Sequence, residues 1–420
     1  MIDNSVRTLF LLKHSPYPPM GGAPLRNWQN IKAMMQLGEV AVFSVSSYKS
    51  PRSREYPPGV SLWKDYSTGD ILKERSLIRK ISDRLWWMRL YGYPEADQFY
   101  GDRVAQELQR LLVEFAPNIV VFEEIWLYRY LKIIKPYGCC LIYDAHNIEK
   151  SLRRDISVSE HKPPFVSSLS GIKTAIIEGY LVQQVDQIWV CSQQEAHLLQ
   201  KLYRQIPPTH IVANGVNIAD YHSDRISHSL PTDGLEPNHF TAIFTATFSY
   251  YPNSVAAQIL IGQIYPQLRK FYPNCRLILA GHSPTPYMKE SAQEDSGIIV
   301  TGKASDIRPY LTAASVVIVP LLKGGGTRLK ILEAFAAHRP VVSTTKGAEG
   351  LNVRDGEHLL IRDKVEDIVA GVCQLWSDSS LGRKLAESAY KLVQQEYSST
   401  AVRQQVEQAV LQLLPSDFRF

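Results

Sequence analysis

Short apolar runs alternate with longer amphipathic stretches along most of this 420-residue chain. Most of the runs are β-branched or aromatic, and most end in Gly, Pro, Ser or Asp. This alternation is typical of parallel strands covered by helices. The runs that predict strands are residues 8–12, 40–45, 119–122, 140–143 and 187–191, and then 241–245, 276–280, 298–301, 316–320 and 341–343. The sequence therefore predicts an α/β fold with two Rossmann-like, doubly wound parallel sheets.

The length favours two domains, because 420 residues exceed what one hydrophobic core usually organises. The stretch 214–240 contains an Asn-Gly pair, two prolines and a further glycine, with little apolar periodicity, so it is typical of a linker. We expect one domain over residues 1–215 and a second over residues 235–396. Two such domains leave a cleft at the carboxyl ends of their strands, where open α/β folds bind ligands.

Composition excludes several classes of protein. The net charge of +5 is too mild to indicate a nucleic-acid partner. The apolar run 9–12 is broken at once by Lys13 and His14, and no apolar stretch reaches 18 residues, so we expect neither a secretory signal nor a membrane span. Five cysteines without a CxxC pair predict free thiols in a reducing compartment. A cytoplasmic protein follows, and the absence of a Cys/His cluster predicts no metal site.

The strongest motif is Gly324-Gly325-Gly326-Thr327-Arg328-Leu329-Lys330, which follows the apolar run 316–320. Consecutive glycines let backbone N–H groups turn toward an anion, and a helix N-terminus adds partial positive charge. Arg328 and Lys330 fall in the first helical turn, where cations are unfavourable unless an anion such as a diphosphate accompanies them. Glu333, one turn further on, is placed to accept hydrogen bonds from ribose hydroxyls. An exposed Lys–Glu pair behind a flexible turn is the alternative.

Further motifs occur in an order that resembles one family over nearly the whole chain. They are Asp-Gln-Ile-Trp-Val-Cys-Ser at 186–192, Val-Ala-Asn-Gly-Val-Asn at 212–217, Thr-Ala-Thr-Phe at 245–248 with Tyr-Pro-Asn at 251–253, Leu-Ile-Leu-Ala-Gly at 277–281, and Val-Thr-Gly at 300–302. Together with the glycine motif they resemble the retaining glycosyltransferases of the GT-B fold, called glycosyl transferases group 1.

The resemblance implies a metal-independent hexosyltransferase. Such an enzyme moves a sugar, with retention, from a nucleotide-diphosphate sugar to a glycan, glycolipid or lipid-linked acceptor of bacterial polysaccharide biosynthesis, and uses no cofactor besides this co-substrate. Arg328 and Lys330 are implied to be catalytic, because they meet the charge on the departing diphosphate. The implied donor-binding residues are Gly21, Gly22, Asn214, Thr247, Gly302, Gly324, Gly325, Gly326, Thr327, Leu329 and Glu333. The domain over 235–396 would bind the donor, and a last helix over 397–420 would pack back on the domain over 1–215, the acceptor side.

This chain departs from the family at one position. The family carries two glutamates eight positions apart; Glu333 matches the second, but Gly325 stands where the first is expected. The contact that the first glutamate makes with the donor sugar is therefore missing. For Gly21 and Gly22, which the resemblance casts as a loop over the donor phosphates before a helix starting near Arg26, a plain strand-to-helix turn is the alternative.

The segment Asp144-Ala145-His146-Asn147-Ile148-Glu149 directly follows the apolar run 140–143. This places His146 at the mouth of the expected cleft, where polar residues are more often functional than in a core. The family has a histidine near the reacting sugar at this point, so His146 is a catalytic candidate. Asp144, Asn147 and Glu149 are candidates for acceptor binding, and a purely structural histidine is the alternative.

The stretch 71–93 interleaves Lys and Arg with Leu, Ile and Trp. On a helix this gives an apolar stripe beside cations, a surface suited to peripheral contact with anionic lipid at the inner face of the membrane. An ordinary core-facing helix with a solvated basic face is the alternative. Two other functions also stay open: a nucleotide-sugar 2-epimerase, and a non-catalytic transferase-like scaffold, which the missing glutamate favours.

Overall fold

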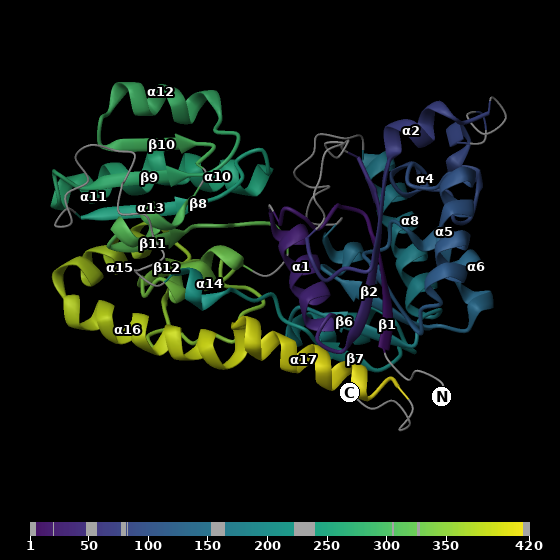
Figure 1. Ribbon diagram of the computed structural model, residues 1–420. Coiled ribbons are helices and arrows are strands. Elements are labelled where there is room, and N and C mark those ends of the chain that lie inside the picture. Colours follow the sequence, from purple (N-terminus) through teal and green to yellow (C-terminus); the bar gives the residue numbers. More distant parts are fainter. Residues whose placement is uncertain are drawn as a thin grey trace. The chain divides into compact units, whose positions relative to one another are not determined.

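The computed structural model describes residues 6–19, 21–47, 57–76, 81, 83–152, 164–221, 240–304, 306–325 and 328–414 (Figure 1). The chain divides into two compact units. Unit 1 comprises Met1–Ala213 and Val402–Phe420, and unit 2 comprises Asn214–Ala401. Each unit is built on one parallel sheet, as the apolar runs predict. Among the described helices, none combines the length and the apolar content needed to cross a bilayer.

Unit 1 has a seven-stranded sheet with the order β3-β2-β1-β4-β5-β6-β7. Its strands are β1 (Val6–Leu12), β2 (Gly38–Ser46), β3 (Leu62–Ser67), β4 (Ile119–Glu123), β5 (Cys140–Ala145), β6 (Gln187–Val190) and β7 (Thr209–Ile211). All five strands predicted for the first half form. The two missed strands, β3 and β7, lie at the edges of the sheet, where one side has no neighbouring strand and a polar, short sequence is tolerated.

Alternate side chains of the central strands fill the two faces of this sheet. Leu9 and Leu11 of β1 join one apolar cluster, whereas Phe10 and Leu12 join the other. This follows from the two-residue period of a strand. The covering helices are α1 (Gly22–Met34) on one face, and α5 (Asp102–Phe115), α6 (Leu131–Ile134), α8 (Pro164–Val182) and α9 (Gln193–Leu202) on the other (Figure 1). The prediction that the first helix begins near Arg26 is wrong: α1 begins one turn earlier, so Arg26 lies inside it and is buried.

Short elements complete unit 1. They are α2 (Thr68–Lys73), η1 (Trp86–Met88), α4 (Pro94–Asp97), η2 (Tyr128–Tyr130) and η3 (Lys135–Tyr137). The expected single helix over 71–93 is therefore not formed, because α2 ends at Lys73 and residues 75 and 76 are not helical. Before α4, the described residues 81, 83 and 84 are helical and the 3₁₀ turn η1 follows them. Two of the arginines of this stretch point inward, since Arg75 contacts Asp83 and Arg89 contacts Asp97, each at 2.6 Å. Its apolar side chains Ile81, Leu85, Met88, Leu90 and Tyr91 are exposed.

Unit 2 has a six-stranded sheet with the order β10-β9-β8-β11-β12-β13. Its strands are β8 (Thr241–Thr245), β9 (Arg276–Ala280), β10 (Ile298–Gly302), β11 (Val316–Val319), β12 (Val341–Ser343) and β13 (Leu360–Ile361). Only β13, a two-residue edge strand, is missing from the sequence-based prediction.

The helices of unit 2 flank these strands along the chain. They are η4 (Ile218–Tyr221), α10 (Tyr251–Ile259), η6 (Leu260–Ile264), α11 (Tyr265–Phe271), α12 (Pro286–Glu294), α13 (Arg308–Ala313), α14 (Leu329–Ala336), α15 (Val365–Ser377), α16 (Ser379–Leu392) and η7 (Val393–Tyr397). Arg328 is the residue before α14, not part of its first turn as expected, because its backbone leaves the helical region at ψ 74°.

The last described helix is α17 (Ser399–Leu411). Ser398 directly precedes it, and the hydroxyl of Ser398 accepts a hydrogen bond from the Ala401 N–H at 3.1 Å. From Val402 onward the helix belongs to unit 1. Val402, Val406 and Val410 share an apolar cluster with Phe10 of β1. The side chain of Gln187 donates to the Ala409 carbonyl at 2.8 Å, which fixes the helix along the sheet.

Candidate functional site

Both sheets reverse their strand order at one point. In unit 1 the chain runs outward from β1 through β2 and then returns to β4 on the other side of β1. In unit 2 the corresponding neighbours are β8 and β11. Crevices at the carboxyl ends of such strand pairs are the usual ligand sites of open α/β sheets. The candidate site segments are therefore those that follow β1, β4 and β5 in unit 1, and those that follow β8 and β11 in unit 2.

The loop after β11 packs closely against the segment after β8. Gly324 has φ +106°, and a Cβ there would lie 3.0 Å from the Tyr250 hydroxyl and 3.4 Å from the Pro252 ring. Glycine is thus required both by the backbone conformation and by the close approach. Gly325 is described and half-buried, whereas Gly326 and Thr327 lie outside the described residues.

Arg328 is turned onto the glycine loop itself. Its guanidinium donates hydrogen bonds of 2.8 Å to the carbonyls of Gly324 and Gly325, and one of 3.1 Å to the carbonyl of Lys346. It also lies 3.7 Å from the Glu349 carboxylate, and the side chain is 6% exposed. These contacts fix the backbone of the glycine loop, because they engage its carbonyl groups.

Lys330 is the second residue of α14, and its side chain lies against an aromatic ring. Its ammonium donates to the side-chain oxygen of Asn253 at 3.0 Å and lies 4.1 Å from the centre of the Phe244 ring. Burial, reinforced by the charge of Arg328, lowers the pKa of Lys330 to about 7, although Glu333 acts in the opposite direction. A bound anion would restore the charged form, so this side chain suits a diphosphate.

Glu333 lies on the same helix, one turn after Lys330. It accepts a hydrogen bond from the hydroxyl of Tyr221, the last residue of η4. Burial raises the pKa of Glu333 to about 7, and the charge of Lys330 offsets only part of this effect. The pair thus forms a half-buried acid–base couple beside the glycine loop.

The remaining predicted donor residues occupy several places in unit 2. Thr247 is exposed after β8, where its carbonyl accepts from the Asn253 side chain at 2.9 Å. Gly302 ends β10 with φ +63° and open space around it. Leu329 is the first residue of α14, and Asn214 is buried at the start of the unit. The structure thus brings Lys330 beside Asn253 and Thr247, whereas Gly302 ends a different strand.

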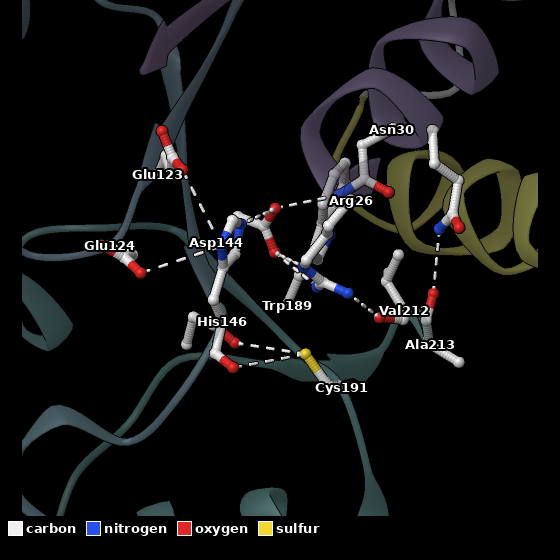
Figure 2. Close-up of polar contacts among 12 residues, drawn as sticks. Arg26, Asn30, Glu123, Glu124, Asp144, His146, Trp189, Cys191, Val212 and Ala213 are labelled. Carbon is white, nitrogen blue, oxygen red and sulfur yellow. Dashed lines mark hydrogen bonds and ion pairs between the residues drawn. The ribbon is translucent and has the colours of Figure 1, made fainter. Parts of the chain in front are cut away.

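In unit 1, His146 lies at the end of β5 with carboxylates on both sides of its ring (Figure 2). Its Nε2 is 3.4 Å from Asp144, and its Nδ1 is 3.8 Å from Glu123 and 3.9 Å from Glu124. Both ring nitrogens are buried without a hydrogen-bond partner in the described part of the chain. Burial is the largest influence and lowers the pKa of His146, but the three carboxylates together outweigh it and raise the pKa.

Asp144 is held by two side chains of α1 (Figure 2). Arg26 donates to its Oδ1 from Nε at 3.0 Å and from Nη2 at 2.5 Å, and Asn30 donates to its Oδ2 at 2.9 Å. A third guanidinium nitrogen donates to the Val212 carbonyl at 2.6 Å. Burial opposes ionisation of Asp144, but Arg26 and His146 prevail and lower its pKa to about 2. Asp144 is therefore an ionised, fully buried carboxylate with both oxygens engaged.

Glu123 ends β4 and Glu124 follows it, and both contact the segment after β1. Glu123 accepts from the backbone N–H of Lys13 at 2.6 Å, and Glu124 accepts from the Lys13 ammonium at 3.1 Å. Burial opposes ionisation of Glu124, but Lys13 and His146 lower its pKa to about 2. Glu124 has φ +55°, a left-handed conformation that costs free energy for a residue with a side chain and is more frequent at functional sites than elsewhere.

Glu178 of α8 holds the segment after His146 in place. Its carboxylate accepts from the backbone N–H groups of Glu149 and Lys150 at 2.7 and 3.2 Å and from the Tyr203 hydroxyl at 2.7 Å. Glu149 itself is buried and Asn147 is half-buried. Gly21 and Gly22 are exposed at the start of α1, and Gly21 has φ +91°.

The sequence-based reasoning missed Arg26, Lys13, Glu123 and Glu124. A signal was present for the two glutamates, because they directly follow a predicted strand, as His146 does. Arg26 offered no such signal, since its role depends on the face that α1 turns toward the sheet. Across the described residues, no group of three or more His, Cys, Asp and Glu side chains is arranged to hold a metal ion.

Comparison with known sequences assigns a family to part of the chain. Residues 239–378, all within unit 2, match the family model described as Glycosyl transferases group 1. An uncharacterized 44.6 kDa protein in the cps region of Klebsiella pneumoniae is 23% identical over 185 residues, which cover 42% of this chain. The match spans 47% of that protein's length.

Comparison with solved structures covers nearly the whole chain. Sucrose-phosphate synthase from Thermosynechococcus elongatus has a TM-score of 0.70 and 15% identity, over 97% of this chain and 99% of that one. HepE from Anabaena, solved in complex with UDP, has a TM-score of 0.68 and 14% identity, over 97% of this chain and 100% of that one. At these identities the likeness shows the fold. The chain thus has the GT-B fold of two parallel α/β domains, and residues 239–378 of its unit 2 are similar to glycosyl transferases group 1.

Proposed function

We propose that this protein is a glycosyltransferase that moves a hexosyl unit, with retention, from a uridine-diphosphate sugar to a glycan, glycolipid or lipid-linked acceptor. The observation that carries the proposal is the Lys330–Glu333 pair on α14, directly behind a glycine loop and within the segment that matches glycosyl transferases group 1. Uridine is favoured because the similarly folded HepE was solved with UDP and with UDP-glucose.

The donor would be held by unit 2. Lys330 faces the diphosphate, and the loop at Gly324 and Gly325 supplies backbone N–H groups, as glycine turns before helices do. Arg328 supports this loop through its bonds to the loop carbonyls, so its effect on catalysis is indirect. Glu333, aligned by Tyr221, accepts hydrogen bonds from the ribose hydroxyls.

The reaction breaks the bond between the anomeric carbon and a diphosphate oxygen, and the electron pair leaves with the diphosphate. Negative charge therefore grows on the phosphate while the sugar gains oxocarbenium character. A preorganised ammonium stabilises that charge more in the transition state than in the ground state, which lowers the barrier without a metal ion. The acceptor hydroxyl bonds to the anomeric carbon and passes its proton to the departing diphosphate.

Unit 1 would serve the acceptor and the reacting sugar. His146 is the group that contacts substrate, and the half-buried Asn147 is the acceptor contact with the most accessible side chain. Asp144, first expected to bind the acceptor, has both oxygens engaged by Arg26 and Asn30. In this scheme it orients His146 and does not touch the acceptor.

The test is a calorimetric titration of the full chain with UDP, GDP, ADP and dTDP. We expect UDP alone to bind in the micromolar range, after which UDP-sugars are tested for turnover with and without acceptors. Absence of binding of all four nucleotides by folded protein would leave the scaffold alternative. Consumption of a UDP-sugar without any acceptor would favour the epimerase.

We further propose that unit 1 contacts an anionic membrane surface through the exposed apolar side chains Ile81, Leu85, Met88, Leu90 and Tyr91. Because Arg75 and Arg89 are engaged by Asp83 and Asp97, the exposed cations in the described part of this stretch are Lys73 and Arg84, and Arg79 and Lys80 lie outside the described residues. Contact would therefore depend mainly on apolar burial, with the cations adding a preference for anionic lipid.

We expect the double variant Met88→Asp/Leu90→Asp to lose affinity for phosphatidylglycerol-containing vesicles by roughly tenfold or more, since each apolar side chain removed from water contributes about 1.5–3 kcal/mol. The measurement is co-sedimentation with vesicles that contain phosphatidylglycerol or phosphatidylcholine alone. Val113→Asp is the matched control, because Val113 is exposed on α5, outside this surface. Equal vesicle binding by the double variant and the control, or none by the unaltered protein, would refute the contact.

A further inference from the structure

The surroundings of His146 differ from those of an ordinary structural histidine. Three carboxylates lie within 4 Å of its ring nitrogens, one at 3.4 Å on the Nε2 side and two at 3.8 and 3.9 Å on the Nδ1 side. A neutral imidazole has one nitrogen that only accepts hydrogen bonds, and a carboxylate also only accepts. One of the two sides would therefore place lone pair against lone pair. Only the imidazolium presents an N–H group to both sides.

The charges around the ring also favour a positive charge on His146. The titratable groups that face this cluster come from every element packed around it: Lys13 and His14 after β1, Arg26 on α1, Glu123 at the end of β4, Glu124 after β4, Asp144 on β5, Glu149 after β5, and Cys191 after β6. Two permanent cations thus stand against four carboxylates. Water is largely excluded, since the His146 side chain is only 6% exposed. A proton on His146 reduces the excess of negative charge in this interior.

We propose that His146 acts as an imidazolium whose Nδ1–H, at 3.8 and 3.9 Å from the facing carboxylates and so beyond hydrogen-bond distance of them, donates a hydrogen bond to the substrate. Glu124 and Asp144 are positioning residues that hold the ring in this protonated form. Lys13 and Arg26 act through these carboxylates, because each fixes one of them by a direct ion pair. A protonated imidazole cannot accept a proton, so His146 does not serve as the general base. The inference rests on the proposed function only for the group that receives the hydrogen bond, an oxygen of the sugar or of the diphosphate.

The test is a pH titration of the histidine ring signals of the full-length protein by NMR, with the His146 signal assigned through the His146→Gln variant. We expect the His146 titration midpoint to lie above the ordinary value of about 6.5. Asp144→Asn and Glu124→Gln should each lower the midpoint by roughly one pH unit or more, because an opposite charge within about 6 Å is removed. Lys13→Met, which removes a cation, should raise it. Glu107→Gln is the control, since Glu107 pairs with Arg110 on the outer surface of α5.

A midpoint at or below 6.5, or one that neither Asp144→Asn nor Glu124→Gln moves, overturns the proposal. Asp144→Asn leaves Arg26 without its partner. If that variant does not fold, the midpoint of His146 in Glu124→Gln decides the test by itself. No substrate is needed, so failure here is distinct from failure of the proposed transferase, which the nucleotide titration detects. Where turnover is measurable, the alkaline limb of the kcat/KM profile should move to lower pH in Asp144→Asn, and a merely structural role for Asp144 would not produce that displacement.

Discussion

Replacing Lys330 with alanine is expected to reduce glycosyl transfer by about a hundredfold or more, the usual consequence of removing one preorganised group that meets transition-state charge. The unfolding temperature should stay close to that of the unaltered protein. Burial already disfavours the ammonium, as the lowered pKa of Lys330 shows, so its loss removes an unfavourable contribution along with the Asn253 hydrogen bond. The measurements are steady-state kinetics and thermal unfolding, with UDP affinity by calorimetry.

Arg328→Ala provides the contrast for this prediction. Arg328 bonds to the carbonyls of Gly324, Gly325 and Lys346, so its replacement should lower activity and the unfolding temperature together. Near-normal turnover of Lys330→Ala would remove the basis for assigning the donor diphosphate to this helix.

The same site should take up a proton when it binds the nucleotide. Above pH 7 the Lys330 amine is largely neutral, since its pKa is lowered to about 7, and a neighbouring diphosphate raises that pKa again. The complex then holds more protons than the free protein, so affinity falls as pH rises through this window. Calorimetry one pH unit above that value, in two buffers of different ionisation enthalpy, measures the uptake. Lys330→Arg stays charged and should show none beyond that of the nucleotide itself.

Replacing Arg26 with methionine should destabilise the protein by about 3–5 kcal/mol, the cost of leaving a buried carboxylate without its partner. Asp144 would lose the guanidinium and keep the Asn30 hydrogen bond and the His146 ring, 3.4 Å away, in an environment closed to water. The double variant Arg26→Met/Asp144→Asn removes both charges and should lose much less than the sum of the two single variants. Chemical denaturation of the full chain, monitored by tryptophan fluorescence and circular dichroism, measures all three.

An exposed ion pair serves as the reference for Arg26. Arg103 and Glu74 also lie 3.0 Å apart in unit 1, but both are exposed, so Arg103→Met should cost less than about 1 kcal/mol. Equal destabilisation by Arg26→Met and Arg103→Met would mean that the Asp144 carboxylate is not held by its partner in the way described.

The central architecture could be predicted from the sequence because it depends on a local signal. A strand with both faces covered carries a nearly continuous apolar run, as Leu9–Leu12 of β1, Ile119–Phe122 of β4, Ala242–Phe244 of β8 and the whole of β11 do. The edge strands β3 and β13 were not predicted. An edge strand has a neighbouring strand on one side only, so Leu62–Ser67 carries a lysine and an aspartate without cost. The glycine motif could likewise be placed, since it depends on residues adjacent in sequence.

The cluster around His146 was only half predictable, for a physical reason. Lys13 and Arg26 meet carboxylates that lie 111 and 118 residues further along the chain, and no local pattern specifies which side chains will meet. The ends of predicted strands do narrow the search, because parallel strands place their carboxyl ends at one edge. The contacts of Arg328 could not be predicted for a related reason: they depend on the backbone conformation of the loop whose carbonyls accept its hydrogen bonds.

The packing of Val402–Val410 on unit 1 affects how the chain must be made. The ribosome completes residues up to Ala213 and then all 188 residues of unit 2 before Val402 emerges. At roughly 5–20 residues per second this delay lasts on the order of 10–40 seconds. Throughout it, the face of the first sheet around Phe10 has no cover from the closing helix. The half of the protein that is synthesised first is therefore the half whose core is completed last.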